Sequence, residues 1–503
     1  MIVEPGALEG DVEDDAEYVI VGTGAAGATA ARVLAEAGAG VVLVEEGPNV
    51  PAAELARGTV ASFGRLLRDA GGQVTSGPLK IPLLQGACVG GSTVVNSGIT
   101  WRIPPWVYDR WAAEFGLSGA LPARELEACF DLLDEELSVR QTREERLGGN
   151  GRVLRTGAER LGWESKTTHR TERDCEGSAR CLEGCANGRR QSMNHSYIPR
   201  ALAAGARLYA GCRVTRVCPR SAGGLAVEGT FALGAGGGGR HTLRAHARKA
   251  VLIAASAIHT PALVLRSGLD STGQVGLHFQ GHPGVSMLAL FDEPIRLWEG
   301  ATQAYEITEF RQRGMKIESL SLPAEVLAAR LPGVGAKLAA YLRQMDRIAV
   351  AAIPIKARAR GTVRTLGPFN RVNYCPEPQD VALAVEGLAR VGQAFFAAGA
   401  RAVLPGIHGL PERISDPAGL ELIRRARPEP GALNWVMTHM MGSCRMGGDP
   451  RTSAVDLRGQ LHGVPGVHVI DSSVFPTNLG VNPQHTIMAV AMVLARRLLE
   501  DRA

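Results

Sequence analysis

A glycine-rich turn near the N-terminus has the residue types and spacing that bind a dinucleotide. Gly22, Gly24 and Gly27 form a G-x-G-x-x-G run. The first glycine permits a tight turn, the second lets backbone N–H groups approach a pyrophosphate, and the third lets a helix pack close to a strand. Glu45 follows 21 residues after Gly24, where a carboxylate can accept hydrogen bonds from a ribose diol. The alternative is a glycine-rich turn beside a solvated glutamate, and this unit alone does not distinguish FAD from NAD.

Three cysteines form a second group with possible chemistry. Cys175, Cys181 and Cys185 have C-x5-C-x3-C spacing in a glycine-containing, loop-like segment. Three thiolates at such spacing could converge on one metal centre, either an iron–sulfur cluster or a zinc ion. Zinc would need a fourth ligand, and His169 and His195 are the nearest choices. The remaining alternative is three reduced cysteines in an ordered loop; this is the expectation we adopt, so no metal ligand is assigned.

The elements around the glycine turn form a strand–helix–strand pattern. Residues 18–21 and 41–44 are short apolar runs, and residues 28–37 are helical in character. Short continuous apolar runs are typical of strands in a buried parallel sheet. Further along, residues 249–255 are predicted to form a strand and residues 260–267 a helix. The nucleotide-binding fold therefore resumes near the middle of the chain.

The pattern changes between residues 286 and 430. Alternating segments occur there together with two predicted helical blocks, residues 324–344 and 380–398. We interpret this stretch as an inserted second domain. Near the C-terminus, residues 486–499 are predicted to form an apolar-rich helix, opened by Asn482-Pro483 and closed by basic residues that suit its negative end.

Composition limits the class of protein. The chain has 503 residues, more than one hydrophobic core usually organises, with 45% apolar and 21% charged residues, as in a soluble globular enzyme. The net charge of +5 comes from 55 basic and 50 acidic residues that are mixed along the chain, so nucleic-acid binding has no support. No apolar run is long enough for a transmembrane segment, and none is predicted.

The cellular compartment is inferred from cysteine usage and from the N-terminus. Nine cysteines, an odd number, argue against a disulfide framework and for a reducing compartment. The first residues are acidic and lack the basic start and apolar stretch of a secretory signal. We therefore expect a cytoplasmic protein.

Four further stretches, taken with the glycine turn, resemble the glucose/methanol/choline (GMC) oxidoreductase family of FAD enzymes. They occur in the family's order, and together the five blocks span residues 18 to 499. Five ordered blocks are far more specific than any one of them. The four stretches are residues 85–96 (QGACVGGSTVVN), residues 252–261 (LIAASAIHTP) with 275–283 (VGLHFQGHP) behind them, residues 439–447 (HMMGSCRMG), and residues 471–476 (DSSVFP) leading to 480–486 (GVNPQHT).

The resemblance implies an α/β fold in two interleaved parts. A Rossmann-like FAD-binding domain would take residues 16–285, including a cysteine-containing loop near 170–195, and residues 431–503. Between them, residues 286–430 would form an α+β substrate domain that carries an antiparallel sheet.

The resemblance also assigns cofactor contacts. Beyond Gly22, Gly24, Gly27 and Glu45, the expected contacts are Gly90, Gly91, Ser92, Asn96, Val214, Ala255, Asp471 and Pro483. Members that bind flavin covalently often use a histidine just before the asparagine of the second glycine loop, and here Val95 occupies that position. FAD is therefore predicted to be noncovalent.

The same resemblance implies oxidation of an alcohol at its CH–OH group by hydride transfer to flavin N5. His439 matches the family's catalytic histidine and is the predicted base for the hydroxyl proton. Asn482 would hold the substrate oxygen and hydrogen-bond the developing alkoxide, although an asparagine there could also cap the C-terminal helix. Whether His485 faces the flavin or only lies in the first helical turn stays open.

The acceptor and substrate are less defined by the resemblance. The cysteine spacing resembles the iron–sulfur loop of FAD-dependent sugar dehydrogenases in this family, which would favour a redox carrier as electron acceptor; without a cluster, oxygen or a soluble acceptor is equally compatible. The expected partner is a small-molecule alcohol, and the uncharged run at residues 338–342 favours a hydrophobic one. Two alternatives are a non-redox FAD-containing lyase and a noncatalytic FAD electron-transfer subunit.

Overall fold

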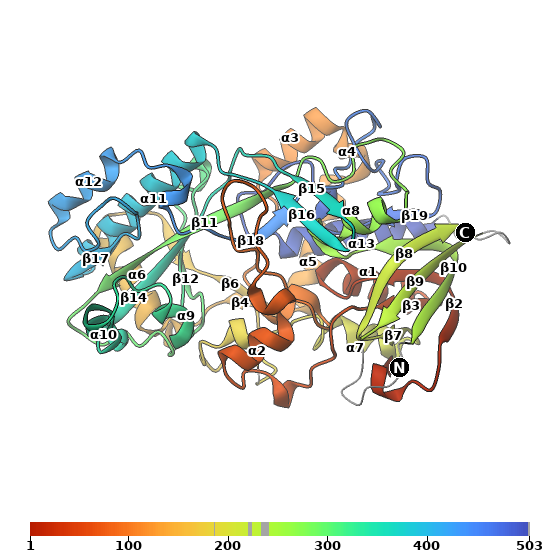
Figure 1. The fold of residues 1–503 in the computed structure, drawn as a ribbon, viewed down its shortest axis with the longest axis horizontal. Coiled ribbons are helices and arrows are strands. Elements are labelled where there is room, and N and C mark those ends of the chain that lie inside the picture. Colours follow the sequence, from red (N-terminus) through yellow and green to blue (C-terminus); the bar gives the residue numbers. More distant parts are fainter. Residues whose placement is uncertain (186, 220–223, 233–240, 501–503) are drawn as a thin grey trace.

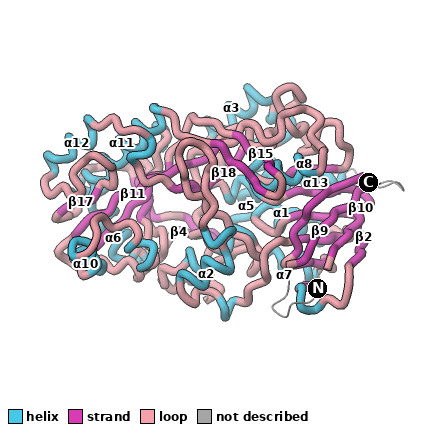
Figure 2. Tube along the Cα trace, viewed as in Figure 1, coloured by secondary structure: helices cyan, strands magenta, loops and turns pink. Residues whose placement is uncertain are grey.

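The computed structural model describes residues 1–185, 187–219, 224–232 and 241–500 (Figure 1). Its strands gather in two large sheets, with helices and loops around them (Figure 2). We call these the first sheet and the second sheet. Within the described residues, no helix is both long and apolar enough to cross a membrane.

The first sheet contains the glycine turn and is largely parallel. Its order is β1-β7-β3-β2-β10-β9-β8, and β19 pairs with β10. Parallel pairing joins β1, β7, β3, β2, β10 and β19, whereas β9 and β8 run antiparallel at one edge. The strands are β1 (Ile2–Val3), β2 (Val12–Val21), β3 (Val41–Val44), β7 (Arg207–Tyr209), β8 (Cys212–Pro219), β9 (Leu225–Phe231), β10 (Thr242–Ile253) and β19 (Val467–Val469).

Helices from both ends of the chain cover the first sheet. Helix α1 (Ala25–Glu36) follows the glycine turn and packs against α13 (Gln484–Glu500) and α7 (Tyr197–Ala203). Helix α5 (Ala123–Glu136) packs on the other side of α13. Because the middle of α13 is buried almost all round, residues near the C-terminus complete the core that the N-terminal strands begin. The predicted α/β architecture is confirmed.

The second sheet is antiparallel. Its order is β17-β11-β14-β13-β12-β5, and β18 pairs with β11. The strands are β5 (Ser165–Thr167), β11 (Gln280–Leu290), β12 (Tyr305–Ile307), β13 (Ile317–Ser319), β14 (Ile348–Pro354), β17 (Ala402–Leu404) and β18 (Val436–Met441).

Two helices, α6 (Gly148–Arg160) and α11 (Pro378–Ala397), pack on the second sheet. The sheet takes most of its strands from the stretch predicted as the substrate domain, residues 286–430. However, β5, α6, the start of β11 and all of β18 come from outside that stretch. The two sheets are therefore more interleaved than the predicted boundaries.

The predicted helical block at residues 324–344 is wrong in its continuity. Two short helices, α9 (Ala324–Ala328) and α10 (Ala336–Leu342), take its place. Pro332 lies between them and cannot donate a helical hydrogen bond, and Gly333 and Gly335 have positive φ of 85° and 57°. The apolar residues on both sides suggested one helix, but the Pro-Gly-x-Gly segment interrupts it.

Smaller elements connect and border these layers. Helix α8 (Ser256–Arg266) packs on β8 and on the hairpin of β15 and β16. The remaining α-helices are α2 (Thr59–Leu66), α3 (Pro105–Phe115), α4 (Leu117–Ala120) and α12 (Leu420–Arg425). The hairpin strands are β15 (Thr362–Leu366) and β16 (Phe369–Asn373), and β4 (Val139–Gln141) pairs with β6 (His169–Thr171).

Candidate active site between the two sheets

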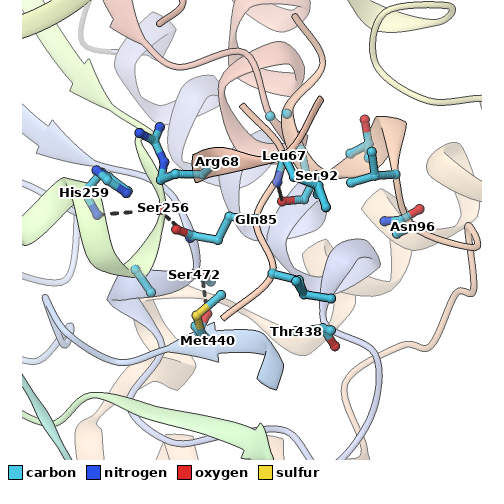
Figure 3. Close-up of a pocket in the computed structure, with 18 of the residues that line it drawn as sticks. Leu67, Arg68, Gln85, Ser92, Asn96, Ser256, His259, Thr438, Met440 and Ser472 are labelled. Atoms are coloured by element: carbon cyan, nitrogen blue, oxygen red, sulfur yellow. Dashed lines mark hydrogen bonds between the residues drawn. The ribbon is translucent and has the colours of Figure 1, made fainter. Parts of the chain in front are cut away.

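A cavity of about 920 Å³ extends from the glycine turn of the first sheet to the face of the second sheet. Its size is in the range of small-molecule and cofactor sites. Figure 3 shows part of its lining: Gln85 donates a hydrogen bond to Ser256 over 2.9 Å, Ser92 and Asn96 lie to one side, and Thr438 lies below. Strand β18 and the start of α8 therefore meet at the same cavity.

The glycine turn fits a dinucleotide. A Cβ on Gly22 would lie 2.4 Å from the backbone oxygen of Ala254, and one on Gly27 would lie 2.0 Å from the oxygen of Gly22, so both positions exclude side chains. Gly24 is different, because a Cβ there would meet nothing within 4 Å, and Gly24 lines the cavity. The N–H groups at the start of α1 are thus open to a phosphate. A side chain at Gly24 would fill the space that a pyrophosphate needs.

Glu45 lies at the end of β3 and lines the same cavity. Its Oε2 accepts hydrogen bonds from the N–H and hydroxyl of Thr23, at 2.9 and 2.6 Å, and its Oε1 accepts one from the N–H of Gly47 at 3.0 Å. Burial raises the pKa of Glu45, and these hydrogen bonds oppose that rise. A carboxylate has about four acceptor positions, so a ribose hydroxyl can still be accommodated.

The second glycine loop lies directly against the first. Gly90 and Gly91 have φ of 96° and 54°, and a Cβ on Gly91 would lie 2.9 Å from the Cα of Gly24. The N–H of Gly90 donates to the hydroxyl of Thr23 at 3.0 Å. Asn96 donates to Gln484 of α13 at 2.6 Å. The loop is thereby fixed both to the glycine turn and to the C-terminal helix.

The predicted cofactor contacts fall into two groups. Gly27 and Gly90 pack behind the cavity wall, whereas the others line it. Those lining residues are Gly22, Gly24, Glu45, Gly91, Ser92, Asn96, Val214, Ala255, Asp471 and Pro483.

Three lining residues, Gln85, Ser97 and His259, also carry buried polar atoms that have no partner among the described residues. Gln85 Oε1 and His259 Nε2 are buried and make no hydrogen bond within the described residues. Since Asn370 donates to the Nδ1 of His259 at 3.1 Å, the ring proton lies on the unpartnered Nε2. One open donor and one open acceptor fit a bound polar group such as FAD.

Asp471 holds the start of α8. Its Oδ2 accepts from the N–H of Ser256 at 2.8 Å and from the hydroxyl of Thr260 at 2.5 Å, and its Oδ1 accepts from the N–H of Ser473 at 2.8 Å. Burial raises its pKa, and these hydrogen bonds oppose the rise. Asp471 therefore shapes the cavity wall through backbone contacts.

Two histidines meet at the other end of the cavity. His439 on β18 and His282 on β11 both line it, and their Nδ1 atoms lie 3.3 Å apart with the ring planes at 87°. The pairing of β18 with β11 brings these residues together. His282 was part of a sequence block that resembles the family, but its contact with His439 depends on this strand pairing.

Hydrogen bonding determines the proton positions in this pair. The N–H of Gly480 donates to His282 Nε2 at 2.8 Å, so neutral His282 carries its proton on Nδ1 and donates it to His439 Nδ1. His439 then carries its own proton on Nε2. Burial, with a contribution from the Lys316 ammonium, lowers the pKa of His439 to about 3, and burial lowers the pKa of His282 well below its usual range. Both rings are therefore neutral near pH 7.

Asn482 lines the cavity beside a buried charge cluster. The Lys316 ammonium donates to Asn482 Oδ1 and to the carboxylates of Glu318 and Glu306, the last at 2.9 Å. Lys316 is only 2% exposed. None of the three charged residues stands out in the sequence, because each lies in a short segment of ordinary polar and apolar alternation. Only their burial distinguishes them from surface residues.

His485 does not line the cavity. Its Nε2 lies 2.7 Å from Asp134 Oδ1 on α5, and its ring stacks on Phe130 with an interplanar angle of 10°. The side chain is about 1% exposed. His485 therefore joins α13 to α5, which answers the question that the sequence left open.

The three cysteines of the 170–195 loop lie beside two buried arginines. Arg170 donates to the sulfurs of Cys175 and Cys181 at 3.7 and 3.4 Å, and the backbone N–H of Arg190 donates to Cys185 at 3.5 Å. Burial alone would raise the pKa of Cys181, but the two guanidinium groups lower it below its ordinary value. Arg190 also donates to the backbone oxygens of Val94 and Asn96, so the cysteine loop is fastened to the loop lining the cavity.

In the part of the chain that the structure describes, no group of three or more histidine, cysteine, aspartate or glutamate side chains is arranged to hold a metal ion. This gives no support to a zinc site with His169 or His195. The expectation of three reduced cysteines stays a prediction, with an iron–sulfur cluster as its alternative.

Comparisons with known proteins agree on one family. A family model described as GMC oxidoreductase matches residues 16–284, and a second model with the same description matches residues 357–491. An uncharacterized GMC-type oxidoreductase of Mycobacterium tuberculosis is 36% identical over 483 residues, which cover 95% of this chain and 75% of the relative. A long-chain-alcohol oxidase of Arabidopsis thaliana is 26% identical over 96% of this chain and 68% of its own length.

A solved structure extends the likeness in fold. Pyridoxine 4-oxidase, from a source given as Mesorbium loti, superposes with a TM-score of 0.68 at 18% identity, covering 96% of this chain and 99% of that protein. At this identity the likeness concerns the fold.

Proposed function

The chain belongs to the GMC oxidoreductase family and is an FAD-containing oxidoreductase acting on CH–OH donors, and we propose that it oxidises a primary aliphatic alcohol to the aldehyde with His439 as the base. The observation that carries the proposal is the position of His439 and Asn482. They come from β18 and from the segment before α13, yet they line the cavity that contains the glycine turn.

FAD, once bound, would supply the hydride acceptor. Gly22, Gly24 and Glu45 would hold its dinucleotide part, and Asn96 and Pro483 line the cavity toward His439. Val95 stands where a covalent histidine link would need a histidine, so noncovalent binding is part of the proposal.

The substrate's hydroxyl proton can be assigned to one of the two ring nitrogens of His439. While His282 donates to His439 Nδ1, neutral His439 carries its proton on Nε2, so Nδ1 is the ring nitrogen with a free lone pair. We therefore assign the hydroxyl proton to His439 Nδ1. The 3.3 Å contact with His282 is long for a hydrogen bond, so a substrate hydroxyl can replace it. His282 Nδ1–H would then be free to donate to the substrate oxygen.

Asn482 stabilises negative charge as the hydroxyl loses its proton. Its Oδ1 already accepts from Lys316, so the amide N–H groups are the part available to the substrate oxygen. A preorganised donor of this kind typically contributes about 10²–10³-fold to turnover.

The substrate class is inferred from the remaining lining. Near His439 the cavity is bordered by apolar side chains, which exclude water and suit an alkyl chain. The run at residues 338–342, which first suggested a hydrophobic substrate, lies on α10 and does not line the cavity, so it gives no support. The similarity to a long-chain-alcohol oxidase does support this class. The lining residues concerned are Val285, Leu320, Leu322, Val326, Val436 and Met440.

The test is reduction of the bound flavin by an alcohol. Purified protein is mixed with n-octanol without air, and loss of the visible flavin absorption is followed. Bleaching supports the proposal and rejects both a non-redox lyase and a noncatalytic electron-transfer subunit. No bleaching with n-octanol or with a panel of shorter and longer primary alcohols would overturn it.

Two further measurements address the cofactor and the electron acceptor. Acid precipitation should release all flavin into the supernatant if binding is noncovalent, and an iron assay on the same sample tests the cysteine loop. Reoxidation of the reduced protein by oxygen, compared with a quinone acceptor, distinguishes an oxidase from a dehydrogenase that passes electrons to a redox carrier.

A further inference from the structure

We propose that Lys316, held between Glu306 and Glu318, is a positioning residue that fixes the amide of Asn482 with its N–H groups toward the substrate oxygen. The inference rests on the proposed function, because it concerns how the alcohol oxygen is bound. It goes beyond that function by naming the buried cluster that makes Asn482 a donor.

The hydrogen-bonding capacity of Lys316 is fully used. An ammonium group has three donors, and here the three acceptors are Glu306 Oε2, Glu318 Oε1 and Asn482 Oδ1. The ammonium also lies 5.2 Å from the ring centre of Trp101, which favours a cation over its face. Lys316 therefore has one defined position, and Asn482 is part of it.

The amide of Asn482 has two ends, and only one is occupied by the protein. Oδ1 accepts from Lys316, whereas Nδ2 makes no hydrogen bond within the described residues. Asn482 is 9% exposed and lines the cavity. A flipped amide would place N–H groups against the ammonium of Lys316, which is unfavourable since both are donors. Asn482 consequently presents its N–H groups, which are hydrogen-bond donors, to the cavity.

The second sheet builds the cluster from neighbouring strands. Glu318 on β13 lies opposite Glu306 on β12, and Glu306 lies opposite Lys166 on β5. Directly opposed residues share a face of the sheet, and so do residues two apart, which puts Lys316 on the same face as Glu318. The carboxylate of Glu318 also accepts from Gln303 at 2.8 Å. Glu306 and Glu318 are thus held by strand register, and Lys316 lies one residue before β13.

Stability alone does not explain such a cluster. Burying ions carries a desolvation cost, and replacing a buried ion pair by apolar residues is often neutral or stabilising. Here Lys316, Glu306 and Glu318 are each no more than 3% exposed at the side chain. This cluster is costly to bury, and its lysine donates a hydrogen bond to Asn482, which lines the cavity. We therefore infer that the cluster serves to orient Asn482.

The charge of Lys316 also acts on His439. Burial would lower the pKa of Lys316, but Glu306 and Glu318 outweigh burial and raise it, so the ammonium stays charged. Together with burial, that charge lowers the pKa of His439 and keeps the base neutral. The other groups that face this pair are Asn482 from the segment before α13 and His282 from β11. Two further charges act nearby: Lys166 on β5 is coupled to the charge of Lys316, and the charge of Lys356 acts on His282.

The experiment compares Lys316→Met with Lys166→Met in the FAD-loaded protein. Lys166 lies 3.8 Å from Glu306 but does not contact Asn482, so it is a matched control. Lys316→Met should lower kcat/KM for n-octanol about 10²-fold. Lys166→Met should stay near wild type. Equal turnover in Lys316→Met and wild type would overturn the proposal.

A binding measurement separates this inference from the proposed function. Octanamide carries a carbonyl that accepts hydrogen bonds but no CH–OH group to oxidise, and its binding is followed by perturbation of the flavin spectrum. We expect Lys316→Met to weaken octanamide about tenfold, the loss of one hydrogen bond. Wild type that binds octanamide but is not reduced by alcohols would contradict the proposed function alone. Unchanged octanamide affinity in Lys316→Met would contradict the role of Lys316.

A second variant guards against misfolding, because Lys316→Met leaves two carboxylates buried. The triple variant Lys316→Met, Glu306→Gln, Glu318→Gln removes the charges together, and its thermal unfolding and flavin content establish that it is folded. It should show the same loss of turnover.

The pH profile of kcat/KM gives a further readout. Without the Lys316 ammonium the pKa of His439 rises, so the acidic decline of kcat/KM moves to higher pH. A pH profile identical to that of wild type would contradict the effect of the Lys316 charge on the pKa of His439.

Discussion

In the first sheet, the groups expected to hold the cofactor lie in turns at the ends of parallel strands, whereas in the second sheet the functional side chains lie across neighbouring antiparallel strands. Gly22 and Gly24 act through their backbone, and their position follows from a few consecutive residues. His439, the proposed base, and His282 would act through side chains that meet only because β18 pairs with β11. The glycine turn is thus a local feature of the chain, whereas the histidine pair depends on strand register.

The largest effect on turnover is expected from a substitution in the second sheet, at His439. His439→Ala removes the proposed proton acceptor, so kcat/KM for n-octanol should fall about 10²–10⁴-fold. Flavin content should not change, since His439 lies at the far end of the cavity from the glycine turn. Steady-state kinetics and the flavin absorption of the purified variant check both points.

The matched control for this variant is His408→Ala, which changes an exposed histidine away from the cavity and should leave turnover unchanged. A His439→Ala protein with wild-type turnover would show that the second sheet does not supply the base.

A smaller effect is expected in acid stability. The pKa of His439 is about 3 in the folded protein against 6.5 as the ordinary value, so between these pH values the unfolded chain binds a proton that the folded chain does not. Stability therefore falls as pH drops from 6.5 toward 3, by up to about 1.4 kcal/mol per pH unit for this group midway between the two pKa values. Between pH 6.5 and 4 the contribution is about 3 kcal/mol.

The variant His439→Asn lacks that titration. Its unfolding free energy, measured by urea denaturation at pH 7 and pH 4, should fall less steeply with acid than that of wild type. If the two proteins lose the same unfolding free energy between pH 7 and pH 4, His439 does not stay neutral in the folded protein.

The first sheet is tested by Gly24→Ala. The added methyl group meets nothing within 4 Å in the protein, so folding should be unaffected, but it enters the space proposed for the pyrophosphate. We expect FAD affinity to fall by about tenfold or more, equivalent to about 1.4 kcal/mol. Titration of the FAD-free protein with FAD measures this.

Gly119→Ala is the comparison for Gly24→Ala, because its methyl group also meets nothing within 4 Å but lies in α4, outside the cavity lining. Equal FAD affinity in the two variants would mean that the glycine turn does not hold the dinucleotide.

The smallest effect on turnover is expected at His485. His485→Gln breaks the contact with Asp134 between α13 and α5, so the unfolding free energy should drop by about 1 kcal/mol, while kcat/KM changes less than about twofold. Thermal unfolding and kinetics on one preparation check this. A large loss of turnover without loss of stability would place His485 in the chemistry.

Much of the fold could be predicted from local patterns. The strand–helix–strand unit around Gly22, the helix now seen as α11 and the C-terminal α13 each follow from apolar periodicity and are confirmed, although β2 begins at Val12 and not at the predicted Tyr18. The predicted helix at 324–344 failed, because the pattern of apolar residues outweighed Pro332 and its neighbouring glycines in the prediction. The membership of β5 and β18 in the second sheet has no local signal, since pairing partners lie far apart in the chain.

Residue types at fixed spacing are enough to identify the family, the glycine turns and the residues proposed for catalysis. The contact of His282 with His439, the hydrogen bond of Lys316 to Asn482, and the position of His485 beside Asp134 and outside the cavity became known from the folded chain. A buried charge or an oriented amide depends on partners from other strands and helices. The distances to those partners arise only when the chain folds, so they cannot be read from residue types and spacing.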